Sequence, residues 1–243
     1  MCEICNHSHA HLSRRSAMLG IGAALSFAAL PLVRVRADQA ISLTPPPNAI
    51  HPGEALKRLM EGNARYAANA PNERDFSHGR AERVTAQYPI AAVLSCSDSR
   101  VSPELAFDQG PGDVFVVRIA GNFVDDDGLA SLEYGVKILG VPLLMVLGHT
   151  NCGAVGAAVK VVTERAELPG HLPELVKAIE PAVIAAHARH PSDLVAAATE
   201  ENVKLNVDRL KQDKPIVSEA FAAKKIDIVG GIYDLATGKI GLL

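Results

Sequence analysis

Two stretches of sequence decide how this chain is organised: Ile90-Ala-Ala-Val-Leu-Ser-Cys-Ser-Asp-Ser-Arg100 and Leu143-Leu-Met-Val-Leu-Gly-His-Thr-Asn-Cys-Gly153. Each stretch opens with an apolar run of the length and character of a strand buried on both faces. Each run then ends in residues that carry chemistry. In parallel sheets, ligands bind beyond the carboxyl ends of the strands. We therefore expect Cys96, His149 and Cys152 to lie together at that edge of a sheet.

The rest of the chain alternates between strand-like and helix-like patterns. Its 243 residues, 48% of them hydrophobic, suffice for one globular domain with a substantial core. The alternation predicts an α/β fold with a mostly parallel central sheet flanked by helices. Strands are expected at 90–95, 114–119, 141–147 and 226–232, and helices at 52–68, 128–139, 154–162, 172–189 and 192–212.

Composition argues against binding to nucleic acid. The 24 basic and 27 acidic residues give a formal net charge of only -3, and they are spread along the chain. A polyanion partner needs a concentrated basic surface, which this distribution does not provide. Tryptophan is absent and aromatic residues make up 4%, so there is little material for stacking on bases. We expect a small-molecule partner and no nucleic acid.

The residues that follow the two apolar runs suit a catalytic zinc site. Two thiolates and one imidazole are a suitable ligand set for zinc and leave a fourth position for water. The spacing of His149 and Cys152 fits a turn leading into a helix, whose N-terminal amides stabilise a thiolate. Gly153 would then permit close approach of the backbone. Taken singly, each of these residues is more often just packed or hydrogen-bonded, but Asp98 and Arg100 beside the first cysteine favour a catalytic site.

The combined pattern resembles a known family. Cys96-x-Asp98-x-Arg100 followed by His149-x-x-Cys152 is similar to the signature of the β-class carbonic anhydrases. The resemblance spans roughly residues 53 to 240 and includes the stretches 96–101, 112–118, 120–122, 131–134, 148–154, 231–235 and 237–238.

This resemblance implies an enzyme, a carbonic anhydrase, that reversibly hydrates carbon dioxide to bicarbonate and a proton. It implies one zinc ion per subunit, held by Cys96, His149 and Cys152, with a hydroxide on the metal as the nucleophile. Arg100 is expected to pair with Asp98, so that this carboxylate accepts a hydrogen bond from the hydroxide. In some family members the aspartate instead turns onto the zinc, and the sequence leaves this choice open. The family also implies a homodimer or a higher homo-oligomer.

Four residues are candidates for the substrate pocket. Val101 and Gly153 are neighbours of the expected ligands, as is the aromatic Phe123. Plant-like members of the family contact substrate with a glutamine, which makes Gln109 a candidate, although counted from Cys96 it lies one position earlier. The histidines elsewhere in the domain are interpreted as solvated surface groups: His171, His187 and His190.

Two other interpretations fit part of this pattern. A relative of the carbonic anhydrases could use the same zinc site on carbon disulfide or carbonyl sulfide. Alternatively, Cys96 and Cys152 could form a structural disulfide in a periplasmic binding protein. The second interpretation leaves His149, Asp98 and Arg100 without an explanation.

The N-terminal residues 1–37 have the layout of a signal peptide. Arg14 and Arg15 precede an apolar stretch at 17–33 and resemble a twin-arginine export signal. The stretch is short for a membrane span of about 20 residues and is interrupted by Pro31. We therefore expect cleavage after Ala37 and no stable membrane anchor.

Export of this kind fits a metalloenzyme. The twin-arginine route carries folded proteins, so thiolates can capture zinc in a reducing compartment before they meet oxidants. We expect a periplasmic or secreted enzyme, with a Pro-rich linker at 38–52 and the folded domain at 53–243. The removed segment contains a cluster that could bind a soft metal: Cys2, Cys5, His7, His9 and His11.

Overall fold

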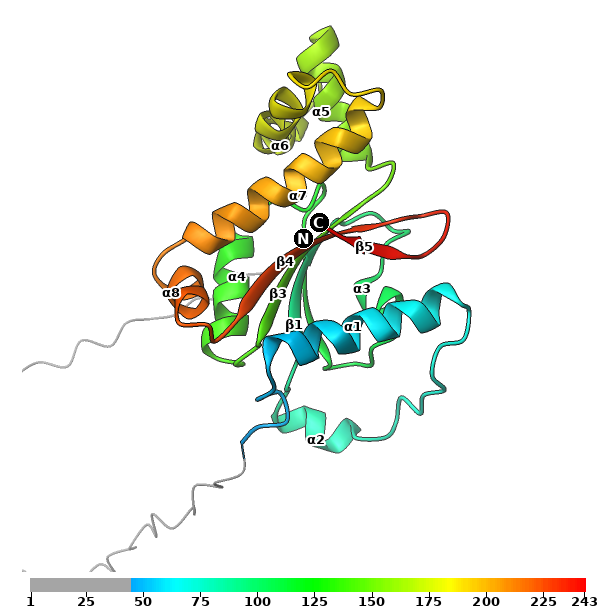
Figure 1. Ribbon diagram of the computed structural model, residues 1–243, viewed down its shortest axis with the longest axis vertical. Helices are drawn as coiled ribbons and strands as arrows, with labels where there is room; N and C mark the ends of the chain where they lie inside the picture. The colour runs from blue at the N-terminus through cyan, green and yellow to red at the C-terminus, as the bar shows by residue number, and fades with distance from the viewer. Residues whose placement is uncertain (1–44) are drawn as a thin grey trace, which may run out of the picture. The chain divides into compact units, whose positions relative to one another are not determined.

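The computed structural model describes residues 45–243, which form an α/β domain (Figure 1). The expected signal peptide at 1–37, its cysteine and histidine cluster and most of the linker at 38–52 lie outside the described residues. Within 45–243, none of the helices combines the length and apolar character needed to cross a membrane.

A five-stranded sheet forms the centre of the domain. Its spatial order is β2-β1-β3-β4-β5, with β1 to β4 parallel and β5 antiparallel to β4. The predicted mostly parallel sheet is thus confirmed, and only the short edge strand β5 was not expected. The strands span Ala91–Ser95 (β1), Val114–Arg118 (β2), Leu143–His149 (β3), Asp227–Tyr233 (β4) and Ile240–Leu242 (β5).

The five predicted helices are all present, with ends that differ by a few residues from the expected ones. They span Pro52–Ala67 (α1), Asp126–Lys137 (α4), Gly153–Glu164 (α5), Leu172–His187 (α6) and Leu194–Gln212 (α7). Three short helices were not expected, because four to seven residues give too few turns for a periodic apolar pattern to show. These are Arg80–Thr85 (α2), Pro103–Ala106 (α3) and Ile216–Ala222 (α8).

Both faces of the sheet are buried because successive strand residues point to opposite sides. Val93 and Met145 face the cluster formed with α1 and α3, which contains Leu59. Leu94 and Val146 face the opposite cluster, formed with α4, α7 and α8. This two-sided burial explains why β1 and β3 read as uninterrupted apolar runs in the sequence.

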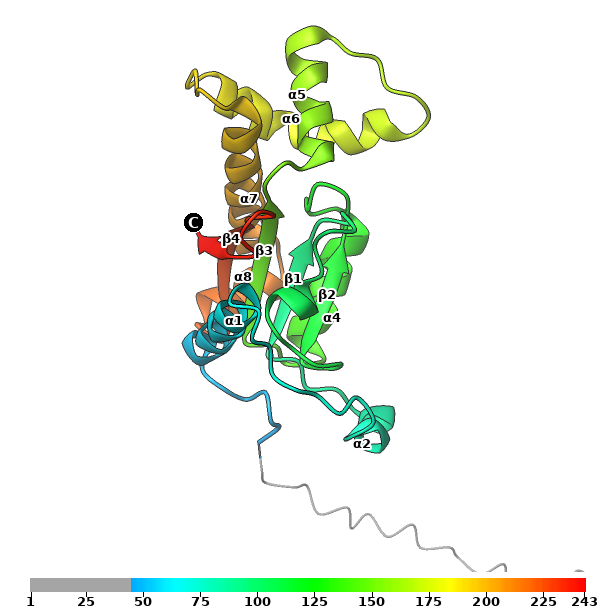
Figure 2. The same cartoon turned by 90° about the vertical axis from the view of Figure 1, so that its right-hand side faces the viewer.

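A third apolar cluster lies beyond the carboxyl ends of the strands. There α5 and α6 pack on each other and on the N-terminal part of α7, as Figure 2 shows. This cluster includes the buried side chains of Cys96 and Cys152 together with those of Val155, Ile179 and Val183. The helices of this cluster therefore bury the two cysteines that follow β1 and β3.

Candidate metal centre

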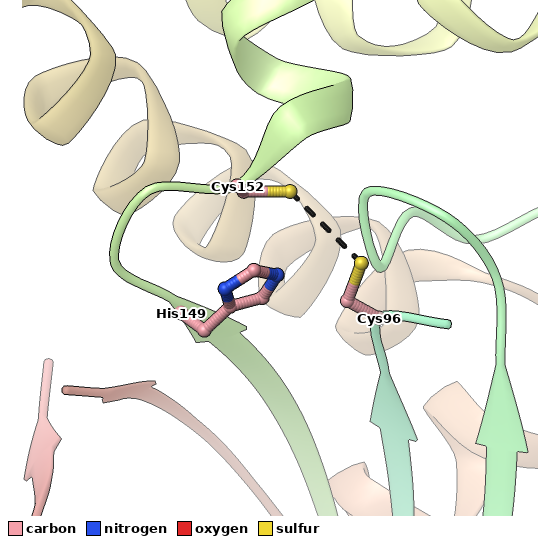
Figure 3. Close-up of side chains that lie close together, drawn as sticks. All are labelled: Cys96, His149 and Cys152. Atoms are coloured by element: carbon pink, nitrogen blue, oxygen red, sulfur yellow. Dashed lines mark hydrogen bonds between the residues drawn. The ribbon is translucent and has the colours of Figure 1, made fainter. Parts of the chain in front are cut away.

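Cys96, His149 and Cys152 converge at the carboxyl edge of the sheet, as expected. Cys96 follows β1, His149 ends the adjacent strand β3, and Cys152 is the N-cap residue of α5. All three side chains are buried, and their ligand atoms lie within 4.8 Å of one another. Figure 3 shows how the imidazole ring and the two thiols approach each other from three different elements.

The orientation of His149 suits metal binding. Its Nδ1 lies 2.9 Å from the carbonyl oxygen of Thr150, and since a carbonyl only accepts, Nδ1 carries the proton. The other nitrogen, Nε2, is buried and has no hydrogen-bond partner among the described residues. Leaving such an atom unsatisfied is costly, so this nitrogen is available as a ligand. Thr150 is in turn tied to β4 through its backbone amide, which donates to Tyr233 at 3.0 Å.

The two thiols form a close pair that is not a disulfide. Both cysteines are free, and their sulfur atoms are 3.9 Å apart, whereas a disulfide requires about 2 Å. The structure therefore contradicts the disulfide interpretation. The hydrogen bond with Cys152 lowers the pKa of Cys96, while that same hydrogen bond, together with burial, raises the pKa of Cys152. Ionising both thiols thus needs a nearby cation, and two thiolates with an imidazole fit zinc.

Asp98 and Arg100 sit beside this centre as a bidentate ion pair. The Arg100 Nε donates to Asp98 Oδ1 at 2.9 Å, and its Nη2 donates to Oδ2 at 2.7 Å. The side-chain hydrogen bond from Arg100 is the main reason that the pKa of Asp98 is well below its usual range. The same Oδ2 lies 3.9 Å from Nε2 of His149. An ionised carboxylate is thus held next to the buried, unpartnered nitrogen.

Arg118 also belongs to the site, although no role for it was predicted from the sequence. It ends β2, and its guanidinium donates to the carbonyl oxygens of Cys96 at 3.0 Å, Asp98 at 2.7 Å and Val101 at 2.8 Å. These three hydrogen bonds hold the turn that carries Cys96 and Asp98. A strand-end arginine in a stretch shared with the β-class family was the available signal, but its partners lie in the turn after the neighbouring strand β1, and the sequence does not show that contact.

The loop after β2 supplies a further contact to the sulfur of Cys96. The backbone amide of Gly121 donates to this Sγ at 3.2 Å. Gly121 has a positive φ of 85°, and a Cβ there would lie 2.5 Å from the side chain of Ile179. Only glycine fits this conformation and this space, which lets the amide reach the sulfur.

The four predicted pocket residues lie in different surroundings. Val101 is fully buried in the cluster beneath α1, away from solvent. A Cβ at Gly153 would meet no atom within 4 Å, so the expected close backbone approach is not present within this chain. Gln109 donates to the carbonyl oxygen of Phe107 at 2.9 Å and lines a cavity of about 420 Å³ whose walls include none of the three metal-ligand candidates. Phe123 packs on the cluster that contains both cysteines.

The surface histidines lie as the sequence suggested. His171 precedes α6, and His187 and His190 lie at the other end of that helix. All three are exposed, and the rings of His187 and His190 have centroids 6.2 Å apart.

Comparisons with known proteins agree with this geometry. The family model described as carbonic anhydrase matches residues 91–240. The carbonic anhydrase of Mycolicibacterium smegmatis is 38% identical over 197 residues, which cover 81% of this chain and 95% of that protein.

Two solved structures share the fold. The β-carbonic anhydrase CafA of Aspergillus fumigatus has a TM-score of 0.63 and 27% identity, covering 79% of this chain and 89% of that one. A structure of tetrameric β-carbonic anhydrases from Sordaria macrospora has a TM-score of 0.64 and 24% identity, covering 78% and 97%. The second likeness concerns the fold alone. The family match, the identity to relatives and the shared fold together show that this chain belongs to the carbonic anhydrases, in their β class.

Proposed function

We propose that this chain reversibly hydrates carbon dioxide to bicarbonate and a proton, with one zinc ion per subunit held by Cys96, His149 and Cys152. The observation that carries the proposal is the meeting of two thiols, an unpartnered imidazole nitrogen and an ionised aspartate at one edge of the sheet. Each of these groups has a distinct task in the reaction, and the membership of the chain in the β-carbonic anhydrases supports the assignment.

The ligands are prepared by the rest of the chain. When bound by such a set, zinc lowers the pKa of a water molecule from about 15.7 to about 7 and so supplies hydroxide at neutral pH. His149 presents Nε2 because its Nδ1 proton is engaged by the carbonyl oxygen of Thr150. Cys152 caps α5, whose N-terminal amides favour the thiolate form.

We assign Asp98 the orientation of the attacking water. An ionised carboxylate can only accept a hydrogen bond, so it turns the O–H of the water toward itself and leaves a lone pair free for the carbon of the substrate. Arg100 keeps Asp98 ionised and occupies both carboxylate oxygens, which fixes the plane of the group. We therefore propose that in the resting site Asp98 is paired with Arg100 and is not itself a ligand of the metal.

The substrate needs only a small apolar space beside this centre. Carbon dioxide is linear and apolar, and Phe123 presents an aromatic ring next to the buried cysteines. Gly153 leaves open space beside Cys152, because nothing in the chain lies within 4 Å of a Cβ built there. We propose that the substrate approaches between these two residues.

The experiment that tests the proposal measures zinc content together with the rate of carbon dioxide hydration by stopped flow. The purified chain should contain one zinc per subunit and be active. Cys152→Ser should lose both zinc and activity, because a hydroxyl does not replace a thiolate ligand. The matched control is Cys5→Ser, the same change in the segment expected to be removed, which should keep both.

The same assay separates carbonic anhydrase activity from related activities. Carbon disulfide and carbonyl sulfide should be offered to the zinc-loaded chain under identical conditions. Rapid turnover of either sulfur compound with little hydration of carbon dioxide would replace the proposed substrate while leaving the metal site intact.

We further propose that the chain assembles into a homodimer or a higher homo-oligomer. The tetrameric Sordaria proteins share its fold, and several large apolar side chains of the described residues are exposed. Among them, Leu105, Ile138 and Ile184 are 63%, 64% and 58% exposed. Sedimentation equilibrium of the purified chain should give a mass at least twice that of one subunit, and a purely monomeric mass would contradict this proposal.

We also propose that residues 1–37 direct export of the folded enzyme and are then removed, leaving the linker at 38–52 and the domain at 53–243. The proposal is supported by Arg14 and Arg15, which precede the apolar stretch. Changing both to lysine should retain active enzyme in the cytoplasm, whereas the same change at Arg34 and Arg36 should leave export intact. Export that is unaffected by the first pair of changes would overturn the assignment.

A further inference from the structure

The buried face of α7 contains two amides where an apolar face would be expected. Burying a side-chain amide is costly unless its hydrogen bonds are satisfied, so the partners of these residues identify their task. The buried residues of this helix recur at helical spacing: Ala198, Thr199, Asn202, Val203, Asn206, Val207 and Leu210.

Both asparagines are engaged with the loop that follows β2. The Nδ2 of Asn202 donates to the carbonyl oxygen of Gly121 at 2.8 Å. The Oδ1 of Asn206 accepts from the backbone amide of Val124 at 2.7 Å, and its Nδ2 donates to the carbonyl oxygen of Asn202 at 2.7 Å. The helix therefore contacts this loop at Gly121 and at Val124, where Arg209 also donates to the carbonyl oxygen, and the two asparagine amides are hydrogen-bonded to each other at 3.2 Å.

The rotation of α7 is fixed independently of these hydrogen bonds. Val203 packs onto two strand glycines, and a Cβ on either Gly148 or Gly230 would lie 2.7 Å from its side chain. The helix thus rests directly on the backbone of β3 and β4. With Val203 seated there, Asn202 and Asn206 are directed at the loop after β2 and cannot easily turn elsewhere.

The loop after β2, which these asparagines contact, also reaches the metal centre. The amide of Gly121 donates to the sulfur of Cys96 at 3.2 Å, while the carbonyl of the same residue accepts from Asn202. We infer that Asn202 is a positioning residue of the metal centre: by holding Gly121, it keeps a hydrogen-bond donor on the Cys96 sulfur. This inference rests on the proposed function, because it assumes that Cys96 binds a metal ion.

Such a donor changes the properties of a thiolate ligand. An N–H directed at sulfur withdraws negative charge from it and holds it in one place. Without the donor, the sulfur gives more electron density to the metal, while the ligand becomes less well positioned. Loss of such outer partners typically weakens metal binding by about 10- to 100-fold. The expected signature is therefore weaker affinity combined with a sulfur-to-metal charge-transfer band at lower energy.

Asn63 offers a matched control in the same chain. It is also buried, and its side chain makes three backbone hydrogen bonds, to Ala106 at 2.9 Å, to Gly238 at 2.8 Å and from Ile240 at 2.8 Å. These hydrogen bonds join α1 to the end of α3, to the turn before β5 and to β5 itself, and none of them involves a residue of the metal centre. Asn63→Leu and Asn202→Leu should both reduce stability, but only Asn202→Leu should change metal affinity and the absorption spectrum.

The test uses the full chain loaded with cobalt(II) for the absorption spectrum and with zinc for affinity by chelator competition. Asn202→Leu should shift the charge-transfer band to lower energy and weaken zinc binding by about tenfold, with Asn63→Leu matching the unchanged protein in both. Asn202→Ser, a smaller polar substitution, serves if the leucine variant does not fold.

The possible failures can be told apart. An unchanged band and affinity in the Asn202 variants, or equal changes in Asn63→Leu, would overturn the positioning role alone. An unsubstituted chain that takes up neither cobalt nor zinc would instead overturn the proposed function.

Discussion

Asp98 and Asp108 lie ten residues apart, and both form ion pairs with arginine, but the two pairs have different roles. Asp98 is 17% exposed and pairs with Arg100, which is itself 54% exposed. Asp108 is only 2% exposed and pairs with two arginines, Arg65 at 2.6 Å and Arg74 at 2.8 Å. Burial acts to raise the pKa of Asp108, but the hydrogen bond from Arg65 and its other contacts outweigh it, so both aspartates have lowered pKa values.

The difference lies in what surrounds each pair. Asp108 joins the C-terminal turn of α1, which carries Arg65, to the following segment, where the backbone amide of Asn72 also donates to it at 3.1 Å. Its contacts are therefore a structural tie between segments distant in sequence. Asp98 has the same chemistry, but one of its oxygens is 3.9 Å from the unpartnered nitrogen of His149. An ion pair does not indicate function by itself, and its distance from the metal-ligand candidates is what separates the two.

The largest expected effect follows from neutralising Asp98. Asp98→Asn keeps the size of the side chain but adds a donor where the proposed reaction needs only an acceptor. We expect the hydration rate to fall by about 100-fold, with zinc content and melting temperature nearly unchanged. Stopped-flow assays on metal-quantified protein give the answer, and a fully active variant would refute the orienting role of this carboxylate.

The same change at Asp108 should lower stability and leave activity nearly unchanged. Asp108→Asn leaves two arginines without their buried partner, and we expect the free energy of unfolding to drop by about 2 kcal/mol. This is below the loss for a fully enclosed pair, because both arginines reach solvent. Urea unfolding measures the change, and the rate per folded, zinc-loaded molecule should stay within about threefold of the original. A drop in that rate as large as for Asp98→Asn would erase the distinction between the two pairs.

The arginines allow a finer test. Arg100→Lys retains the positive charge but loses the planar fork that binds both carboxylate oxygens. We expect Asp98 to remain ionised but to be less well oriented, so that hydration falls by about tenfold. Stability should change little, because Arg100 itself is 54% exposed and lysine keeps its charge. If the lysine variant matches the original rate, charge alone is sufficient and the geometry of the fork is irrelevant.

The contrast between the two aspartates also shows how far the sequence can be interpreted. Cys96, His149 and Asp98 were predictable because each follows an apolar run that must be a buried strand, and strand ends meet at one edge. Asp108 was not, since its partners Arg65 and Arg74 are more than thirty positions away in sequence and follow no periodic pattern. The sheet, its parallel order and the five main helices were likewise predictable from periodicity.

Contacts between distant elements account for most of what was missed. Arg118 donates to the turn that follows the neighbouring strand β1, and Asn202 donates to Gly121, 81 positions away in the sequence. Such hydrogen bonds depend on how α7 and the strands pack, which is set by tertiary contacts and leaves no local signature. The substrate residues stay predictions. Gln109 was chosen by similarity to a family position and not by its place at a strand end, and in this chain it lines a cavity whose walls include none of the three metal-ligand candidates.

The smallest expected effect concerns pH. A carboxyl whose pKa is lowered in the folded state stabilises that state at pH values above its unfolded pKa of about 3.9, and this stabilisation is lost as pH falls through the folded pKa. The free energy of unfolding should therefore decrease below about pH 4, and part of that decrease belongs to Asp108. Asp108→Asn has no such group to protonate, so its stability should fall less steeply over the same window. Loss of zinc in acid affects both proteins alike, so the difference between their urea midpoints at pH 6 and pH 3.5 isolates the aspartate. A constant difference would mean that Asp108 has nearly the same pKa in the folded and unfolded chains, so that its two arginines do no more than offset the effect of its burial.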